Sequence, residues 1–291
     1  MNLGLFAQLT VSGFVVGSMY ALLGVSFGII YATTKIFHMA HAVVYAAAAY
    51  TAVWSSETLG LSLLPACLVG LFVGVLFGLL IELGAYRPMR TRNASLMTIF
   101  LVSLGISVAF PNLLQLIFGP DNRAAPGFSN PIYELGAVTI SRHDILTVAV
   151  AWPLIFAVIA LIARTRFGRS VTAMRTNPMM AAAVGIDSGT VYLAVFGIGS
   201  LLVSVAGLLF LTDAVASPTM GSTPMLSGLI AAFLGGIGSL SGAAMGGLFL
   251  GLVSGWSALF LQINYGPIVV FGAMFLLLLV RPQGLLGKTG V

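Results

Sequence analysis

The chain has 291 residues, of which 59% are hydrophobic and only 7% are charged. A soluble domain usually carries about 25% charged residues, so this composition excludes a soluble globular protein and indicates one with many membrane spans. The net charge of +5 does not require nucleic acid as a partner, because the basic residues lie at the ends of apolar runs, where membrane topology accounts for them. The single cysteine, Cys67, excludes an internal disulfide and a CxxC metal site.

Apolar runs along the chain predict an all-α polytopic bundle in a single transmembrane domain over residues 1–291. A helix needs about 20 apolar residues to cross a bilayer, so we expect about eight to ten crossings, with nine as the first choice. The runs lie at about 6–31, 41–54 (or to 60), 62–83, 95–118, 145–163, 191–211, 226–240, 242–261 and 265–280.

Broken or short helices are expected near 32–42 and near 226–242. The run in the second region is short for a full span, and the stretch Lys35–His41 fits a break inside the membrane. Such breaks are tolerated where neighbouring helices or a water-filled path satisfy the exposed backbone. The second region is rich in glycine, including Gly235, Gly236 and Gly238.

His38 and His41 lie three residues apart in the first break. A metal site would need a third ligand and a supporting second shell, and no acidic residue lies within fifteen positions of the pair. We therefore expect no metal. Two interpretations stay open: a packing or interfacial role, and the lining of a path through the membrane.

Acidic residues lie near the ends of the runs or between them, and none is expected at the middle of a span. Ion-coupled carriers usually keep a titratable group within the membrane, so a proton-driven mechanism is disfavoured, whereas a Na⁺ site built from backbone carbonyls stays open. No Ser/His/Asp arrangement suggests catalysis, so we expect no catalytic residues. The acidic residues are Glu57, Glu82, Asp121, Glu134, Asp144, Asp187 and Asp213.

Glycines recur at every fourth residue in several runs. Small residues let helix backbones approach closely in lipid. We interpret these rows as packing within the chain, with a subunit interface as the alternative. The rows are Gly13 and Gly17, Gly24 and Gly28, Gly70 to Gly78, Gly238 to Gly246, and Gly247 to Gly255.

Basic residues predict the orientation, because Lys and Arg loops are retained in the cytoplasm. Only Arg123 and Arg142 fall on the opposite face, together with a long outer connection at about 119–144. The coupling segment described next and the C-terminus should therefore be cytoplasmic, and with nine crossings the N-terminus should face outward. The residues expected on the cytoplasmic face are Lys35, Arg87, Arg90, Arg92, Arg164, Arg166, Arg169, Arg175, Arg281 and Lys288.

The basic segment at about 164–187 contains a short helix with defined ends. Asn177 followed by Pro178 is typical of a helix start, and Gly185 is typical of its C-cap. Met179, Met180, Ala183 and Val184 then provide a compact apolar face. A docking helix that enters a groove on a cytoplasmic partner is the functional interpretation, and a helix lying on anionic lipid is the alternative.

The closing stretch "RPQGLLGKTG" is a near miss to a nucleotide-binding loop. The lysine and threonine of GxxxxGK[ST] are present at Lys288 and Thr289, but Pro282 occupies the position of the first glycine. The sequence also predicts neither a strand before the stretch nor a helix after it. We therefore expect no nucleotide site there.

Five stretches in order resemble one family over nearly the whole chain. They are "GFVVGSMYALLGVSFGIIYATTKIFHMAHAVVYAAAAY", "ELGAYRPMR", "FGRSVTAMRTNPMMAAAVGID", "AFLGGIGSLSGAAMGGLFLG" and "RPQGLLG". The chain resembles the permease subunit of bacterial ABC importers for branched-chain amino acids, of the LivH/LivM type and closer to LivH by length. It departs from the family's "NFAHG" at the first break, where His38 replaces Asn and Ala42 replaces Gly.

The resemblance implies an inner-membrane importer that works by alternating access and is not itself an enzyme. It implies a second permease subunit (the same or a different chain), two cytoplasmic ATPases that bind the ATP, and a periplasmic solute-binding protein. No cofactor of its own is implied. Residues implied to couple to the ATPase are Arg169, Arg175, Asn177, Pro178, Ala183 and Gly185. Residues expected along the path are Phe37, His38, His41, Gly235, Gly236 and Gly238.

The solute expected from the resemblance is a branched-chain or other hydrophobic amino acid. Permeases of the same kind for urea, amides or aromatic acids are the alternative. An ion-coupled secondary carrier and a membrane-embedded enzyme are the competing classes.

Overall fold

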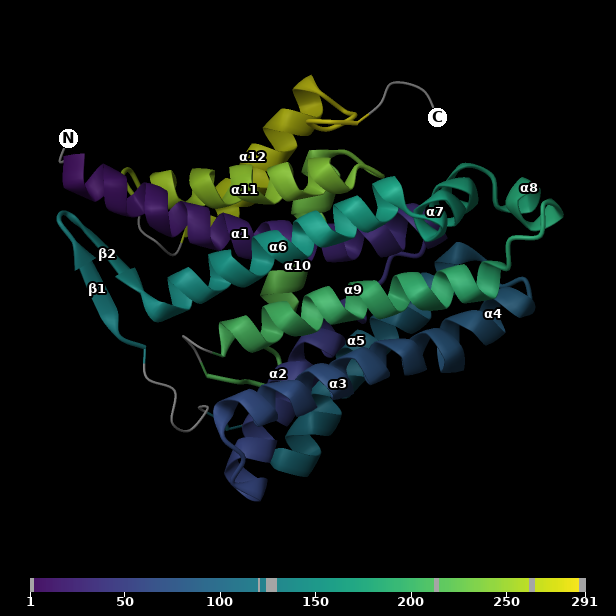
Figure 1. Ribbon diagram of the computed structural model, residues 1–291, viewed down its shortest axis with the longest axis horizontal. Helices are drawn as coiled ribbons and strands as arrows, with labels where there is room; N and C mark the ends of the chain where they lie inside the picture. The colour runs from purple at the N-terminus through teal and green to yellow at the C-terminus, as the bar shows by residue number, and fades with distance from the viewer. Residues whose placement is uncertain (1–2, 120, 124–129, 212–214, 262–264, 288–291) are drawn as a thin grey trace. The chain divides into compact units, whose positions relative to one another are not determined.

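The computed structural model describes residues 3–119, 121–123, 130–211, 215–261 and 265–287, and these residues are mainly helical (Figure 1). The chain divides into two compact units. Unit 1 comprises Met1–Gly28, Ser129–Ile159 and Leu226–Val291, and unit 2 comprises Ile29–Phe128 and Ala160–Met225. The prediction of an all-α polytopic bundle is confirmed, while a single domain over 1–291 stays a prediction.

Unit 2 holds most of the basic residues and the first helix break. Its elements are α2 (His41–Leu59), α3 (Leu63–Ile81), the π-helical turn η1 (Glu82–Tyr86), α4 (Arg87–Thr91), α5 (Leu96–Phe118), α7 (Arg166–Thr176), α8 (Pro178–Ala183) and α9 (Ser188–Phe210).

Glycines on α3 let it pack directly on α2 and α9. A Cβ atom at Gly70 would collide with the carbonyl oxygen of Ala48 on α2. A Cβ at Gly74 or Gly78 would collide with the hydroxyls of Ser204 and Ser200 on α9. The row Gly70–Gly78 therefore packs within the chain, as the sequence predicts.

Unit 1 is built from segments at the start, middle and end of the chain. Helices α1, α6 and α10 each pass from one unit into the other. Its elements are α1 (Leu3–Thr34), β1 (Ile132–Leu135), β2 (Val138–Ser141), α6 (Arg142–Arg164), α10 (Ser222–Gly235), α11 (Leu240–Ser257) and α12 (Gly266–Val280).

Close backbone contact and two indole hydrogen bonds hold α1 in unit 1. A Cβ atom at Gly247 or Gly251 on α11 would collide with backbone atoms of Ala21 or Gly17 on α1, which explains why these positions favour glycine. Trp152 of α6 donates to Ser18 and Trp256 of α11 donates to Thr10, both at 3.0 Å. A buried cluster of Ile230, Ala231, Leu234, Leu250 and Val270 completes the core of this unit.

Each of the nine expected apolar runs contains a helix, although several boundaries differ. Six helices are long and apolar enough to cross a membrane, and Ser222–Gly235 and Ile268–Val280 are shorter apolar helices. The run expected at 62–83 continues as one helical stretch to Thr91, so Glu82 lies inside a candidate span rather than near its end. The number of crossings stays a prediction.

Both expected helix breaks are confirmed. Residues 35–40 separate α1 from α2, and residues 236–239 separate α10 from α11. Positive φ angles mark these breaks, +58° at Lys35, +104° at Gly236 and +93° at Gly238. Glycine adopts such angles without strain, whereas lysine does so rarely.

A β-hairpin occupies part of the expected outer loop, and the sequence analysis did not anticipate it. Strands β1 and β2 pair with Leu135 opposite Val138, and Gly136 in the two-residue turn has φ +66°. The side chain of Gln8 binds the hairpin, because its Oε1 accepts from the backbone N–H of Thr139 at 2.7 Å. The hairpin is thereby tied to the first turns of α1.

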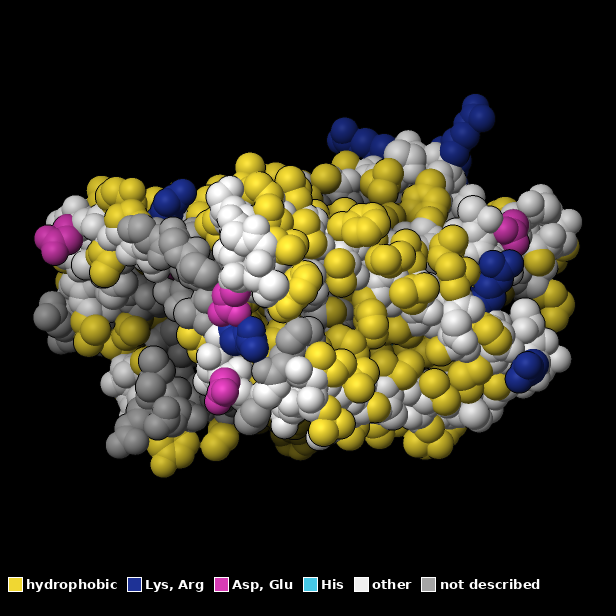
Figure 2. Space-filling model, turned by 90° about the horizontal axis from the view of Figure 1, so that it is seen from below, with side chains coloured by type: hydrophobic (Ala, Val, Ile, Leu, Met, Phe, Trp, Pro, Cys, Tyr) yellow, Lys and Arg dark blue, Asp and Glu magenta, His cyan; other side chains and the backbone are white. Residues whose placement is uncertain are grey.

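Apolar side chains cover most of the molecular face in Figure 2, and Lys and Arg side chains are few there. Large apolar side chains on α3, including Leu64, Leu68 and Phe72, are exposed. A soluble monomer rarely exposes a large contiguous apolar surface. In a membrane protein, such a surface contacts lipid.

Candidate coupling segment and helix-break site

The basic segment forms two consecutive helices. The sequence predicts one short helix approached by arginines, but the approach is itself helical, as α7. The side chain of Thr165 caps α7 by accepting from the N–H of Gly168 at 3.1 Å. Val171 and Met174 bury one face of α7, while Arg169 is exposed. The arginines therefore project from a fixed helix rather than from a loop.

Both ends of α8 are defined as the sequence predicts. The Asn177 side chain accepts from the N–H of Met180 at 3.0 Å, and Pro178 occupies the first helical position. At the other end, Gly185 has φ +85° and its N–H donates to the carbonyl of Ala182 at 3.0 Å. These features confirm the predicted helix start and stop, whereas the coupling role of Arg169, Arg175, Asn177, Pro178, Ala183 and Gly185 stays a prediction.

The outer face of α8 is apolar and uncovered in the isolated chain. Met179, Met180 and Val184 are 83%, 65% and 75% exposed, and Ala183 is exposed beside them. Ala181 on the opposite face is buried. Helix caps hold this patch in place, so it is a rigid projection suited to insertion into a groove.

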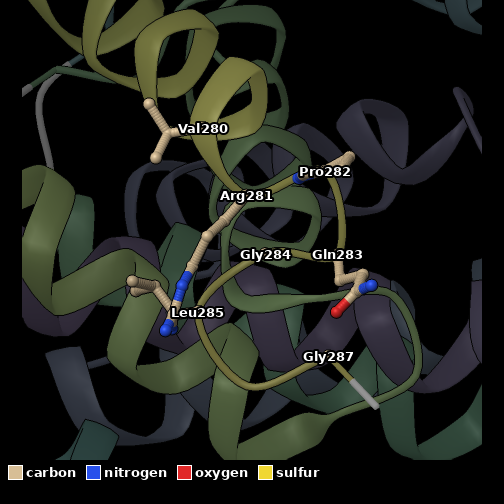
Figure 3. Close-up of a pocket in the computed structure, with 7 residues that line it drawn as sticks. All are labelled: Val280, Arg281, Pro282, Gln283, Gly284, Leu285 and Gly287. Carbon is tan, nitrogen blue, oxygen red and sulfur yellow. The ribbon is translucent and has the colours of Figure 1, made fainter. Parts of the chain in front are cut away.

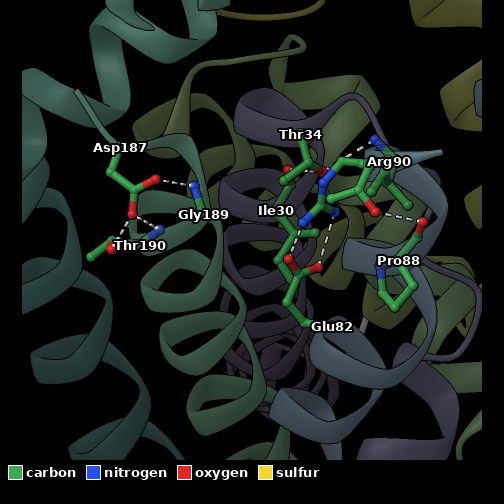
Figure 4. A network of polar contacts seen from close by, with 10 residues as sticks. Ile30, Thr34, Glu82, Pro88, Arg90, Asp187, Gly189 and Thr190 are labelled. Atoms are coloured by element: carbon green, nitrogen blue, oxygen red, sulfur yellow. Dashed lines mark hydrogen bonds and ion pairs between the residues drawn. The ribbon is translucent and has the colours of Figure 1, made fainter. Parts of the chain in front are cut away.

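Asp187 connects α8 to α9. Its carboxylate accepts from the N–H groups of Gly189 and Thr190 at 3.1 and 3.0 Å, and also from the Thr190 hydroxyl (Figure 4). The Thr190 hydroxyl, followed by the two backbone N–H groups, lowers the pKa of Asp187 from its usual range. Only four residues, 184–187, separate the two helices. The connection between α8 and α9 is therefore short.

Basic residues gather at one end of unit 2. Helices α4, α7 and α8 lie at the same end of this unit in Figure 1. They carry or adjoin Arg87, Arg90, Arg92, Arg164, Arg166, Arg169 and Arg175. This grouping agrees with the positively charged face that the sequence predicts. Lys288, which also entered that prediction, lies outside the described residues, as does Asp213 of the acidic residues.

A buried ion pair lies just beyond the end of α3. Glu82, 1% exposed, binds the guanidinium of Arg90 through both carboxylate oxygens (Figure 4). The guanidinium carbon of Arg90 also lies 4.6 Å from the centre of the Tyr192 ring on α9. This distance is within the range of a cation–π contact, so one arginine joins η1 to α9.

The first helix break is filled by a hydrogen-bonded cluster. His38 Nδ1 lies 2.8 Å from the Tyr86 hydroxyl, and that hydroxyl donates to Ser103 Oγ at 2.7 Å. The Ala40 N–H donates to the same Ser103 oxygen at 3.0 Å. The rings of His38 and His41 lie 5.3 Å apart, and both residues are buried. The cluster satisfies backbone that the break would otherwise leave unpaired.

Phe37, the other path residue expected here, packs its ring 5.6 Å from that of Phe100. A cavity of about 200 Å³ lies nearby, lined by Ala42, Ser107, Val108, Pro111, Asn112, Pro218, Thr219, Gly221 and Ser222. The structure thus gives the two histidines a packing role. Their part in a path stays a prediction.

The second break is closed by backbone contacts with the segment after α12. The N–H groups of Leu285 and Leu286 donate to the carbonyls of Leu234 and Gly235 at 2.8 and 3.0 Å. A Cβ atom at Gly236 would lie 2.8 Å from the carbonyl oxygen of Gln283. Gly235 and Gly236 thus pack closely against neighbouring backbone in unit 1, while Gly238 contributes a positive φ angle to the break. The role of all three in a path stays a prediction.

The segment after α12 encloses a hollow of about 340 Å³, lined by Val280, Arg281, Pro282, Gln283, Gly284, Leu285 and Gly287 (Figure 3). A helix precedes this loop, whereas a nucleotide-binding loop follows a strand. The described part of the loop therefore lacks that context. Among the described residues, no three His, Cys, Asp or Glu side chains lie close enough to hold a metal ion.

A family model described as the permease component of the branched-chain amino acid transport system matches residues 9–279. The chain belongs to this family. BraD of Pseudomonas aeruginosa, a high-affinity branched-chain amino acid transport system permease protein, is 31% identical over 98% of this chain and 97% of its own. LivH of Escherichia coli K12, named in the same way, is 32% identical over the same shares. The xylose permease XylH of that strain is 32% identical over only 39% of this chain and 31% of its own.

Membership in this permease family makes the chain a multi-pass membrane protein and a component of a transport system. Its relatives are transport permeases rather than enzymes. The polar contacts of Tyr86, Arg90 and Tyr192 were nevertheless not predicted from the sequence. Tyr86 and Arg90 lie within the quoted stretch "ELGAYRPMR". Arg90 lies eight positions after Glu82, whereas side chains that pair on a regular α-helix lie three or four positions apart.

Proposed function

We propose that this chain is the permease subunit of an ATP-driven importer in the bacterial inner membrane. Separate cytoplasmic ATPases bind the ATP, a second permease subunit completes the path, and a periplasmic protein delivers the solute. The observation that carries the proposal is α8: an apolar patch that is capped at both ends, exposed, and placed beside arginines.

The exposed face of α8 fits a groove on a cytoplasmic partner. Met179, Met180 and Val184 would lose their contact with water on docking, and methionine adapts well to a partner surface. Arg169 and Arg175 on the preceding helix would add charge complementarity at the rim of that interface. A helix resting on anionic lipid is the alternative, but the caps and the direct link to α9 favour transmission of force to a span.

Alternating access follows from this arrangement. The partner ATPases approach each other when they bind ATP, and α8 moves with them. The movement favours one of two arrangements of the spans, and only a difference in ATP affinity between these arrangements can bias them. The chain's own residues supply docking and transmission, and no catalytic group of this chain takes part.

Branched-chain or other hydrophobic amino acids are the proposed solutes, because BraD and LivH are named for branched-chain amino acid transport. Urea, short amides and aromatic acids are alternatives that the same architecture can serve. An ion-coupled secondary carrier is disfavoured because the buried carboxylate of Glu82 is already bound by Arg90.

Reconstitution tests the source of energy. The purified chain, alone and with its partners, would be placed in liposomes and assayed for leucine uptake. Uptake is expected only with the partners and ATP. Uptake by the chain alone under an ion gradient would refute the proposal.

Substitution on α8 tests docking. Met180→Glu should lower ATP-dependent uptake about tenfold or more, because a charge in an apolar interface costs more than about 1.4 kcal/mol. Met180→Leu keeps the apolar volume and should retain uptake. Equal uptake by both variants would contradict docking through this face.

Labelling tests the orientation. A cysteine at Thr176, in a Cys67→Ser background, should react with an impermeant maleimide only after cells are opened. A cysteine at Gly136 in the hairpin should react in intact cells. The reverse pattern would place the coupling segment on the wrong side.

A further inference from the structure

The π-helical turn η1 holds two polar contacts that point to different parts of unit 2. Glu82, its first residue, binds Arg90, which stacks on Tyr192 of α9 at 4.6 Å. Tyr86, its last residue, binds His38 at 2.8 Å and Ser103 at 2.7 Å. One short turn is thus attached to α9 on one side and to the helix break on the other.

The turn itself sets the geometry of the ion pair. In a regular α-helix, positions eight apart differ by two turns plus about 80° of rotation, so the side chains of Glu82 and Arg90 would point about 80° apart. A π-turn closes i→i+5 hydrogen bonds and holds more residues per turn, so the rotation per residue is smaller and the two side chains come nearer in phase. Single π-turns inside α-helices are frequent at functional sites.

The α9 end of this connection is attached to the coupling segment. Tyr192 lies five residues after Asp187, the residue that caps α9. A Cβ atom at Gly189 would lie 3.7 Å from a guanidinium nitrogen of Arg87, so α4 also lies against the first turn of α9. Movement of α8 therefore reaches Tyr192 through the first turns of a regular helix.

Tyr86, at the other end of η1, is attached to the first helix break by hydrogen bonds. Tyr86 is fully buried, and Ser103 accepts both from Tyr86 and from the backbone N–H of Ala40 inside the break. The rings of His38 and Phe196 lie 5.2 Å apart, so α9 touches this cluster too. A rotation of η1 cannot occur without breaking or moving the hydrogen bonds that hold residues 38–40.

We propose that η1 is the element that transmits movement from α8 to the first helix break, with Arg90, Tyr192 and Tyr86 as positioning residues. This inference rests on the proposed function, since it assigns a route to the force that α8 receives. Bistable packed elements carry such coupling between separate sites.

The experiment uses the complete importer in proteoliposomes and measures leucine taken up per ATP hydrolysed. Arg90→Lys keeps a charge beside Glu82 but loses the bidentate fork and the planar stacking of arginine. Uptake per ATP should fall about fivefold or more, the usual size of coupling between two sites, while assembly and basal ATP hydrolysis persist. A merely structural role would lower assembly and hydrolysis together.

Tyr192 provides a second pair of variants in case Arg90→Lys fails to assemble. Tyr192 is only partly buried. Tyr192→Phe keeps an aromatic face and should retain coupling, whereas Tyr192→Leu should lose it. Full uptake per ATP in both Arg90→Lys and Tyr192→Leu would overturn the proposal.

An ion pair at the other end of unit 2 gives a matched control. Arg123 binds Glu57 at 2.7 Å, and both side chains are partly exposed. Arg123→Lys makes the same chemical change far from η1 and should leave uptake per ATP unchanged. If Arg123→Lys also lowered uptake per ATP, the measurement would respond to any weakened ion pair. The proposal that η1 transmits the movement would then be refuted.

A solute-independent readout separates the two proposals. A cysteine at Met39 in the break, in the Cys67→Ser background, would be labelled with a maleimide with and without a non-hydrolysable ATP analogue. The analogue should change the labelling rate in the parent complex and not in the Arg90→Lys complex. A change that survives Arg90→Lys refutes transmission through η1, whereas uptake by the purified chain alone under an ion gradient refutes the proposed function instead.

Discussion

Replacement of Gly70 by alanine tests the direct contact between α2 and α3 in unit 2. The added Cβ atom would collide with the carbonyl oxygen of Ala48 and would lie 2.9 Å from the Cβ of Ala52. Neither atom belongs to the end of a flexible side chain, so α2 and α3 must separate to admit the methyl group. Gly105→Ala on α5 is the matched control, because a Cβ atom there meets nothing within 4 Å.

The difference between these two variants isolates the steric cost. Alanine favours a helix over glycine by about 1 kcal/mol, and this gain is common to both sites. Overpacking a tight contact costs about 1–3 kcal/mol. Gly70→Ala should therefore be less stable than Gly105→Ala by about 1–3 kcal/mol, and against the parent chain it should range from neutral to about 2 kcal/mol less stable.

The free energy of unfolding can be followed by circular dichroism during titration of mixed micelles with SDS. The parent chain, Gly70→Ala and Gly105→Ala would be compared under one set of conditions. Equal midpoints for the two variants would refute the direct backbone contact between α2 and α3.

Two further predictions concern the cap of α9 and the second helix break. Because its hydrogen bonds lower the pKa of Asp187, the charged cap stabilises α9 above the pKa of an unfolded aspartate, and this contribution is lost as the pH falls through the lowered folded-state pKa. On acidification the melting temperature of the parent chain should therefore approach that of Asp187→Asn, and parallel pH profiles would contradict this. Gly236→Ala, at φ +104°, should cost about 1–3 kcal/mol and speed amide hydrogen exchange at Leu285 and Leu286, whose N–H groups donate to Leu234 and Gly235. Gly272→Ala, whose Cβ meets nothing within 4 Å, should leave this exchange unchanged, and equal exchange rates in the two variants would contradict the prediction.

The helices were predictable because hydrophobic length is a strong signal in a membrane protein. Each of the nine apolar runs contains a helix, and both breaks lie where glycine or a polar stretch interrupts a run. The ends of α8 were equally predictable, since Asn177, Pro178 and Gly185 each act through the local backbone. Signals of this kind need no knowledge of distant parts of the chain.

The contacts around η1 could not be predicted in this way. A π-turn changes the phase of a helix without a distinctive residue pattern, so the pairing of Glu82 with Arg90 has no α-helical spacing to reveal it. Tyr86 and His38 are distant in sequence and meet only through packing. The hairpin had a weak local signal in Gly136, and α7 had one in the cap at Thr165 and the apolar pair Val171 and Met174.

The division into two units has a consequence for how the protein is made. Every segment of unit 2 precedes residue 226, whereas unit 1 needs its opening helix, a middle segment and residues 226 onward. The carbonyls of Leu234 and Gly235 find their donors only when Leu285 and Leu286 have been synthesised. Unit 2 can therefore close while the ribosome is still translating, and α1 must wait in the bilayer for the partner helix α11 that arrives more than 200 residues later.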